Sequence, residues 1–207
     1  MNGIGGRQVL WAAMALVALA SFAAADEPKQ TPENTIKVGP IGPVKPQTFP
    51  RPVKFFIEEA IDRSGNPQPM LVYKPRGGIF LDRQPTEIVR EALEDTLRAT
   101  GLLAEDSASA DYLLTVYVFS FGLAAGAGND FYGKTDLNVV VKDARTGASQ
   151  EVTALGTSIQ GLAVRKKNIM KNVKENIEQS LQDGLRNFLR GTKLRDAVAG
   201  AAAPAPG

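Results

Sequence analysis

The chain has 207 residues, with 24 basic and 22 acidic side chains and a net charge of +2 at neutral pH. It contains neither cysteine nor histidine, which excludes disulfides, cysteine-based metal sites and Ser-His-Asp or Cys-His catalysis. The balanced charge gives no sign of nucleic-acid binding. We therefore expect no catalytic residue, no cofactor and no bound metal.

The N-terminus has the pattern of a secretory signal peptide. Arg7 provides a positive charge, Val9–Ala20 is apolar, and Ala23-Ala24-Ala25 is a small-residue cleavage site. We expect residues 1–25 to be removed after Ala25, which leaves a periplasmic protein. The alternative is an uncleaved Val9–Ala25 segment that tethers the chain to the inner membrane.

Residues 26–52 are rich in proline and glycine and are predicted to form an extended arm or linker, with a short strand at Thr35–Val38. A single domain is expected over residues 53–191. Its first predicted elements are a strand at Val53–Ile61 and a hairpin formed by Met70–Tyr73 and Ile79–Leu81.

Two segments have the periodicity of amphipathic helices. Pro85–Thr100 places apolar residues at spacings of three and four, and Gly101 is a natural end. Lys167–Arg190 has the same pattern over a longer span and ends before Gly191. Residues 192–207 are rich in alanine and proline and are predicted to be a disordered tail.

The strands between these helices follow an alternating pattern. Strands are predicted at Tyr112–Phe121, Asp136–Lys142 and Glu151–Ile159, with a glycine-rich loop at Gly122–Gly133 and a hairpin turn at Asp143–Gly147. The predicted class is α+β in two layers, with a four- to five-stranded, mostly antiparallel sheet and two amphipathic helices on one face.

Residues Gly128–Thr135 match the phosphate-loop pattern G-x-x-x-x-G-K-[ST]. That chemistry requires a helix starting at the lysine, because helix amides bind the phosphates. Here Lys134 precedes a β-branched alternating run, which favours a hairpin loop without nucleotide.

Two further groups of residues have the side chains, but not the pattern, of catalytic sites. Ser158 lies in a sequence with one residue too many for a nucleophile elbow, and no histidine exists to activate it. Glu58, Glu59 and Asp62 are the carboxylates on which the alternative of a periplasmic hydrolase rests. Solvated charges on an edge strand are the favoured interpretation of all three.

Candidate contact residues fall in two places. Phe131 and Tyr132 end the predicted glycine-rich loop, where aromatic side chains either anchor a partner or fold onto the sheet edge. Basic residues gather near the start of the long helix, where the helix dipole does not favour cations. They are predicted to form a solvated face or to contact anionic lipid or an acidic partner: Arg165, Lys166, Lys167, Lys171 and Lys174.

The order of these motifs resembles small Gram-negative envelope proteins, the auxiliary lipoproteins of ABC transport and lipopolysaccharide assembly. The matching features are a strand ending at Asp62-Arg63, the helix segment Ile88–Leu93, the strand start Ala110–Leu114, the turn Asp143–Gly147 and the terminal helix. The resemblance covers about residues 53–190 and implies a non-enzymatic role with an envelope protein partner. This chain lacks the lipidated cysteine of that group.

Overall fold

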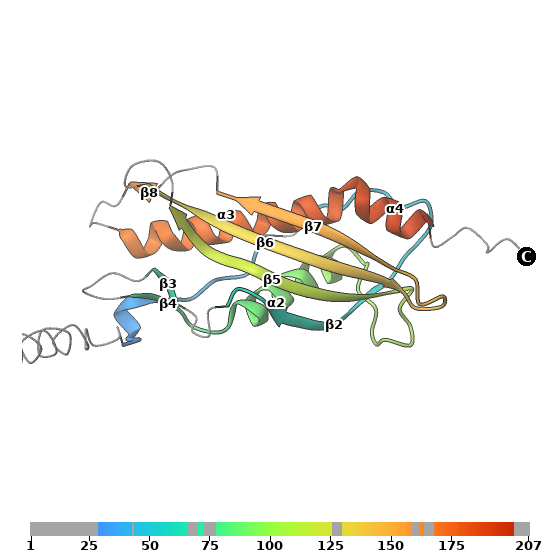
Figure 1. Cartoon of the computed structure of the whole chain (residues 1–207), viewed down its shortest axis with the longest axis horizontal. Coiled ribbons are helices and arrows are strands. Elements are labelled where there is room, and N and C mark those ends of the chain that lie inside the picture. The colour runs from blue at the N-terminus through green and yellow to red at the C-terminus, as the bar shows by residue number, and fades with distance from the viewer. Residues whose placement is uncertain are drawn as a thin grey trace, which may run out of the picture.

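The structure is a computed structural model that describes residues 29–42, 44–65, 70–72, 78–125, 130–158, 162–163 and 168–200. The predicted signal peptide therefore lies outside the described residues. Figure 1 shows the elements along the long axis of the molecule. In chain order they are η1 (Pro32–Asn34), β1 (Thr35–Ile36), β2 (Phe55–Asp62), β3 (Met70–Val72), β4 (Ile79–Leu81), α2 (Pro85–Ala99), β5 (Tyr112–Ala125), β6 (Asp130–Asp143), β7 (Ser149–Thr157), β8 (Leu162–Ala163), α3 (Ile169–Arg190) and α4 (Thr192–Gly200).

The main sheet has the order β2-β5-β6-β7, and β8 pairs with the start of β6. The pairs β5–β6 and β6–β7 are antiparallel hairpins, whereas β2 runs parallel to β5. Parallel neighbours need a long crossover, and here α2 lies between the two strands in the chain. The predicted α+β class is confirmed, with a sheet that is mixed because of this one parallel pair.

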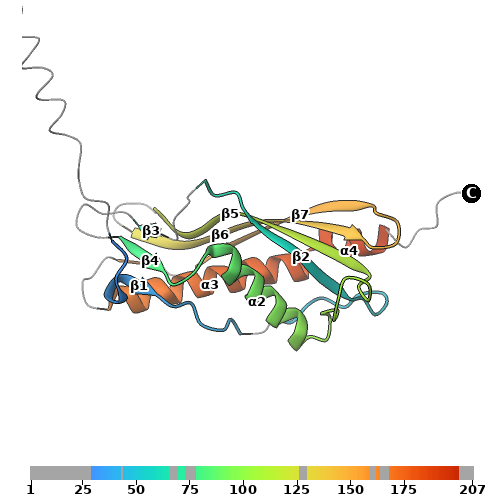
Figure 2. The same cartoon turned by 90° about the horizontal axis from the view of Figure 1, so that it is seen from below.

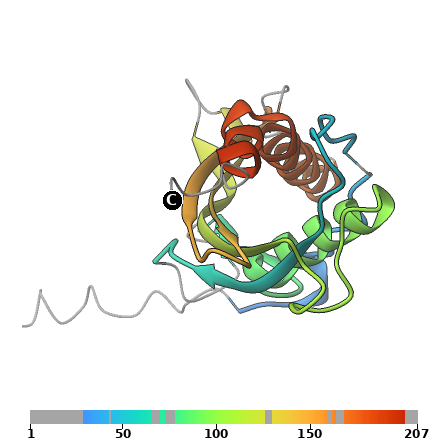
Figure 3. The ribbon, with the colours of Figure 1, turned by 90° about the vertical axis from the view of Figure 1, so that its right-hand side faces the viewer.

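Both long helices lie on the same face of the sheet, as the sequence predicts. Helix α2 packs on β2 and β5, and α3 packs across β7, β6 and β5. Figures 2 and 3 show the sheet curving around the two helices, which lie side by side in its concave face. Their apolar stripes meet the inward residues of the strands and form one core.

The N-terminal arm is part of the domain rather than a free linker. Its apolar residues Ile36, Val38, Ile41 and Val44 are buried in the core, and β1 joins β3 and β4 in a small second sheet. The Gly39 N–H donates to Glu178 Oε1 of α3 at 2.8 Å. The predicted boundary at residue 53 is therefore wrong, because the apolar residues between Ile36 and Val44 supply buried surface to the core.

The C-terminal boundary also needs correction, because residues 192–200 form helix α4 instead of a disordered tail. Leu194, Ala197 and Val198 have helical spacing and are buried. The Tyr112 hydroxyl donates to the Val198 carbonyl at 2.9 Å. The alanine-rich composition that suggested disorder is also favourable to a helix when it carries an apolar stripe.

The hairpin of β5 and β6 is longer than predicted. The loop predicted at Gly122–Gly133 is too long at both ends. Strands β5 and β6 remain paired up to Ala125 opposite Phe131. Backbone pairing and the packing of Phe121 and Leu123 against the core outweigh the low strand propensity of glycine. Residues 126–129, including Gly128 and Asn129 of the phosphate-loop match, lie outside the described residues.

Helix α3 lies unusually close to β6 and β7, and glycines make this approach possible. A Cβ atom on Gly156 would lie 2.0 Å from the Ser180 carbonyl oxygen, and one on Gly133 would lie 2.1 Å from the Asn176 carbonyl oxygen. Gly184 of α3 faces the same contact. Hydroxyls fill the remaining space, with Thr135 Oγ1 and Ser180 Oγ 3.0 Å apart. We call these close contacts the glycine seam.

The free edge of β7 is also closed by α3. The Asn187 side-chain amide donates to the Leu155 carbonyl at 2.6 Å, and the Thr157 N–H donates to the Asp183 carboxylate at 3.2 Å. These side chains satisfy backbone groups that would otherwise have no strand to pair with.

The glycine seam predicts that Gly156→Ala destabilises the protein by about 1–3 kcal/mol, since the new methyl group must displace backbone atoms of α3. Urea unfolding monitored by circular dichroism measures the change. Gly42→Ala is the matched control, because its Cβ would lie 3.4 Å from the flexible end of Gln182, and it should change stability by less than about 0.5 kcal/mol. Equal stability of the two variants would contradict the argument.

Candidate functional site

The candidate site lies on the convex side of the main sheet, opposite the helices. Figure 1 shows this side turned toward the viewer with no helix across it. Residues alternate along each strand, so that Leu137, Val139 and Val141 are buried while their neighbours face outward. We call this side the outer face; its outward apolar side chains are Phe56, Ile61, Leu113, Tyr117, Phe119, Tyr132, Val140 and Leu155.

Phe119 and Leu155 are the large apolar side chains most exposed on the outer face. Their exposed fractions are 48% and 53%. Phe119 lies at the irregularity in the β5–β6 register, next to Ser120, which pairs with Asp136, and Asp136 in turn pairs with Leu155. The two side chains therefore lie on either side of β6, about two strand spacings or ~10 Å apart. Together they form an apolar pair open to solvent.

Polar contacts surround this apolar pair. The Arg63 guanidinium lies 5.5 Å from the centroid of the Tyr117 ring. Asn138 donates to Glu151 at 3.0 Å, and Lys134 and Asp136 are 3.9 Å apart. Asp136 of β6 lies between Phe119 and Leu155, so exposed apolar side chains alternate here with polar and charged ones, a mixture also found on protein-binding surfaces.

Sequence reasoning missed Phe119 and Leu155. The alternation along β5 could have identified Phe119. The buried residues Tyr112, Leu114, Val116 and Val118 occupy every second position, and Phe119 falls on the alternate positions that face outward. The prediction instead selected Phe131 and Tyr132, which lie within β6 and not on a loop. Phe131 packs against the core, and Tyr132 points to the outer face. The sheet therefore separates the two predicted aromatics onto opposite faces.

The predicted basic cluster is described in part. Arg165, Lys166 and Lys167 lie outside the described residues. Lys171 is 3.7 Å from Glu175, and Lys174 is 3.5 Å from Glu178, each as an i,i+4 pair on α3. Such exposed pairs contribute little to stability, and a contact of these lysines with anionic lipid stays a prediction.

Ser158 has a structural role between β6 and α3. It is buried, its hydroxyl accepts the Gly133 N–H at 2.8 Å and donates to the Asn176 side chain. These bonds hold the hydroxyl within the glycine seam, which is a structural role for Ser158.

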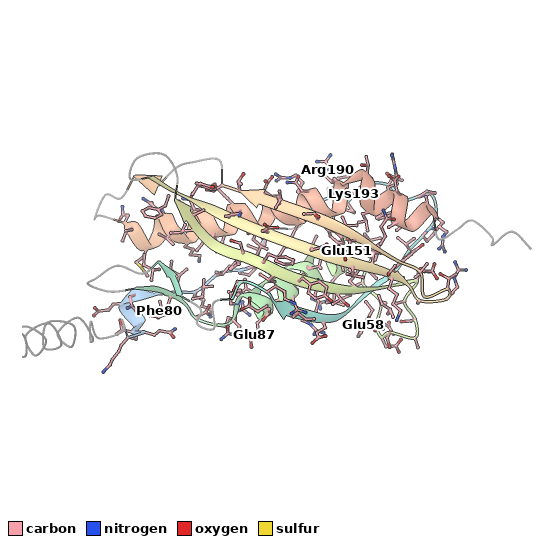
Figure 4. All side chains as sticks on the ribbon, in the orientation of Figure 1. Glu58, Phe80, Glu87, Glu151, Arg190 and Lys193 are labelled. Carbon is pink, nitrogen blue, oxygen red and sulfur yellow. The ribbon has the colours of Figure 1, made fainter. Side chains whose placement is uncertain are left out.

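The carboxylates considered for hydrolysis lie on the edge strand β2. Glu58, Glu59 and Asp62 are all exposed, and Asp62 accepts the Ser64 N–H at 2.7 Å. Figure 4 shows Glu58 on β2, on a different strand from Glu151 of β7. In the described part of the chain, no group of three acidic side chains is placed to hold a metal ion.

Asp143 ends β6 and organises the β6–β7 turn. Its Oδ1 accepts the N–H groups of Arg145 at 2.9 Å and Thr146 at 2.7 Å. Burial alone would raise the pKa of Asp143, but these two N–H donors, the Thr146 side chain and the positive charge of Arg145 together outweigh it and hold that pKa below its usual range. The carboxylate is therefore ionised at neutral pH although it is only 2% exposed.

Comparison with known proteins gives a fold relationship. No family model matches the sequence, and no curated protein matches it significantly. The fold is similar to that of protein XCC0632 from Xanthomonas campestris, described with family DUF330, at a TM-score of 0.58 and 13% identity, over 81% of this chain and 99% of that chain. This likeness establishes a shared fold.

Weaker similarities are found to two further structures. The PelC dodecamer from Paraburkholderia phytofirmans gives a TM-score of 0.39 at 16% identity, over 71% of this chain and 95% of that chain. A minor lipoprotein from Acinetobacter baumannii gives 0.34 at 14% identity, over 66% and 91%. Within the described residues, no helix has the length and apolar character needed to cross a membrane.

Asp143 predicts a specific pH dependence of stability. Because its folded pKa is depressed, its ionisation stabilises the fold above the ordinary aspartate pKa of about 3.9, and this contribution is lost as the pH falls through the folded pKa. Asp143→Asn should be about 1 kcal/mol less stable than wild type at pH 7, because hydrogen bonds to a charged acceptor are stronger. Chemical unfolding at pH 7 and pH 3 should show this difference shrinking; a constant difference, or an equal effect of Glu105→Gln in the exposed loop, contradicts it.

Proposed function

We propose that this chain is a non-enzymatic accessory protein of the bacterial cell envelope and acts in the periplasm by binding an envelope protein. The observation that carries the proposal is the pair Phe119 and Leu155, which are half exposed on an outer face with no helix across it. Two large apolar side chains half exposed on one face of a sheet mark that face as a candidate protein-binding surface.

Three other features support the proposal. The N-terminal sequence predicts export, and the absence of cysteine and histidine excludes the common catalytic arrangements. The order of motifs along the chain resembles that of auxiliary envelope lipoproteins. The finer part of the proposal is that the partner belongs to a transport or outer-membrane assembly system.

Photo-crosslinking in intact cells tests the binding surface. Benzoylphenylalanine replaces Phe119 or Leu155, and as a control it replaces Arg98, which is exposed on α2 on the opposite side of the sheet. We expect the same envelope protein to be captured from both outer-face positions and not from Arg98. Adducts that form equally at Arg98, or no adduct at either outer-face position, would overturn the assignment of this surface.

Substitution separates binding from folding at the same positions. Phe119→Ala with Leu155→Thr should weaken capture at least tenfold, because buried aromatic and aliphatic anchors dominate interface energies. The thermal midpoint should change little, since both side chains are half exposed in the free protein. Thr153→Ala, on the same face of β7, is the control and should bind normally.

Export is tested by the intact mass of the protein isolated from cells. Cleavage after Ala25 gives a chain that begins at Asp26, as the small-residue motif predicts. Recovery of the full 207-residue chain in the inner-membrane fraction would instead support the tethered alternative.

A further inference from the structure

A small pocket lies at the far end of the sheet from the β5–β6 hairpin tip, between the β6–β7 turn and helix α4. Its volume is about 140 Å³. Its lining comes from the inner face of the sheet, the turn and α4: Tyr112, Val141, Asp143, Ala148, Ser149, Gln150 and Ala197. It is separate from the outer face on which the proposed function rests.

Asp143 is the charged residue among those that line the pocket. Its side chain is 98% removed from solvent, and its Oδ1 is engaged by the turn. Its Oδ2, by contrast, is buried and has no hydrogen-bond partner among the described residues. A buried carboxylate oxygen without a donor is costly, so the pocket contains an acceptor that a donor from outside would satisfy.

The neighbouring polar groups are occupied by other contacts. The Tyr112 hydroxyl donates to the Val198 carbonyl, and it accepts a bond of 3.3 Å from Arg51. Arg51 is also 3.5 Å from Asp111, and its hydrogen bond to Tyr112 raises the pKa of its guanidinium above the ordinary value. Arg51 therefore stays charged and bound at this position, where its charge also interacts with the Asp143 carboxylate, but it makes no hydrogen bond to Oδ2.

We propose that this pocket receives the end of a basic side chain, a lysine or arginine of a partner polypeptide, which donates to Asp143 Oδ2. The volume is too small for ligands that need about 300 Å³ or more, but it accommodates a side-chain end. Val141, Ala148 and Ala197 offer an apolar wall for a methylene stem, and the carboxylate meets the charged head, which is how long basic side chains are accommodated.

The test uses n-butylammonium as a probe of a lysine side chain. The isotopically labelled mature protein is titrated at constant ionic strength, and the amide resonances of Ala148, Ser149, Gln150 and Ala197 are followed by NMR. We expect saturable shifts at these residues with n-butylammonium, and none with n-butanol, which has the same stem but no charge.

Two variants and one control identify the source of binding. Asp143→Asn keeps an acceptor for the turn but removes the charge, and it should weaken binding at least tenfold. Ala148→Leu fills the pocket while it keeps the carboxylate, and it should weaken binding to a similar extent. Glu151→Gln removes an exposed carboxylate of β7 and should bind like wild type.

Several outcomes overturn the proposal. They are the absence of saturable shifts, equal shifts with n-butanol, unchanged affinity of Asp143→Asn, and a crystal structure with the probe in which a water alone contacts Oδ2. Because the readout is local to the pocket and needs no partner protein, it is independent of the crosslinking result on the outer face.

Discussion

The close packing of α3 on β6 and β7 is the contact on which the rest of the fold depends. Gly133 and Gly156 lack the side chains that would hold helix and sheet apart, and Gly184 of α3 faces Gly156 across the contact. The backbones then approach closely enough for Thr135, Ser158 and Ser180 to bond within the seam. Leu181, Leu185 and Phe188 of α3 are buried beside the seam. The short distance between α3 and the sheet therefore determines how these side chains pack in the core.

This contact also assigns different roles to the two faces of the sheet. The inner face packs against α3 and stabilises the fold. Thr135, Ser158 and Ser180 form structural hydrogen bonds there. The outer face keeps Phe119 and Leu155 in solvent, and the end of the sheet keeps a buried acceptor on Asp143.

Local periodicity was sufficient to predict most elements of the fold. Helices α2 and α3 begin and end within about two residues of their predicted limits, and the Asp143–Gly147 turn forms as expected. The errors arise where composition competes with tertiary packing. Glycine suggested a loop at residues 122–133 and alanine suggested disorder after residue 191, but neither composition reveals the partner surface that stabilises a strand or a short helix. The binding candidates Phe119 and Leu155 depend on a register irregularity and on face assignment, which need the assembled sheet.

The closure of the β7 edge has a consequence for how copies of this protein meet. Asn187 and Asp183 occupy the Leu155 carbonyl and the Thr157 N–H, so an incoming strand finds no open ladder at this end of β7. Intermolecular β-augmentation, the usual route from exposed edges to aggregation, is blocked there by side chains of the same helix that forms the core. The chain thereby gains protection at an edge that its own hairpins leave unpaired.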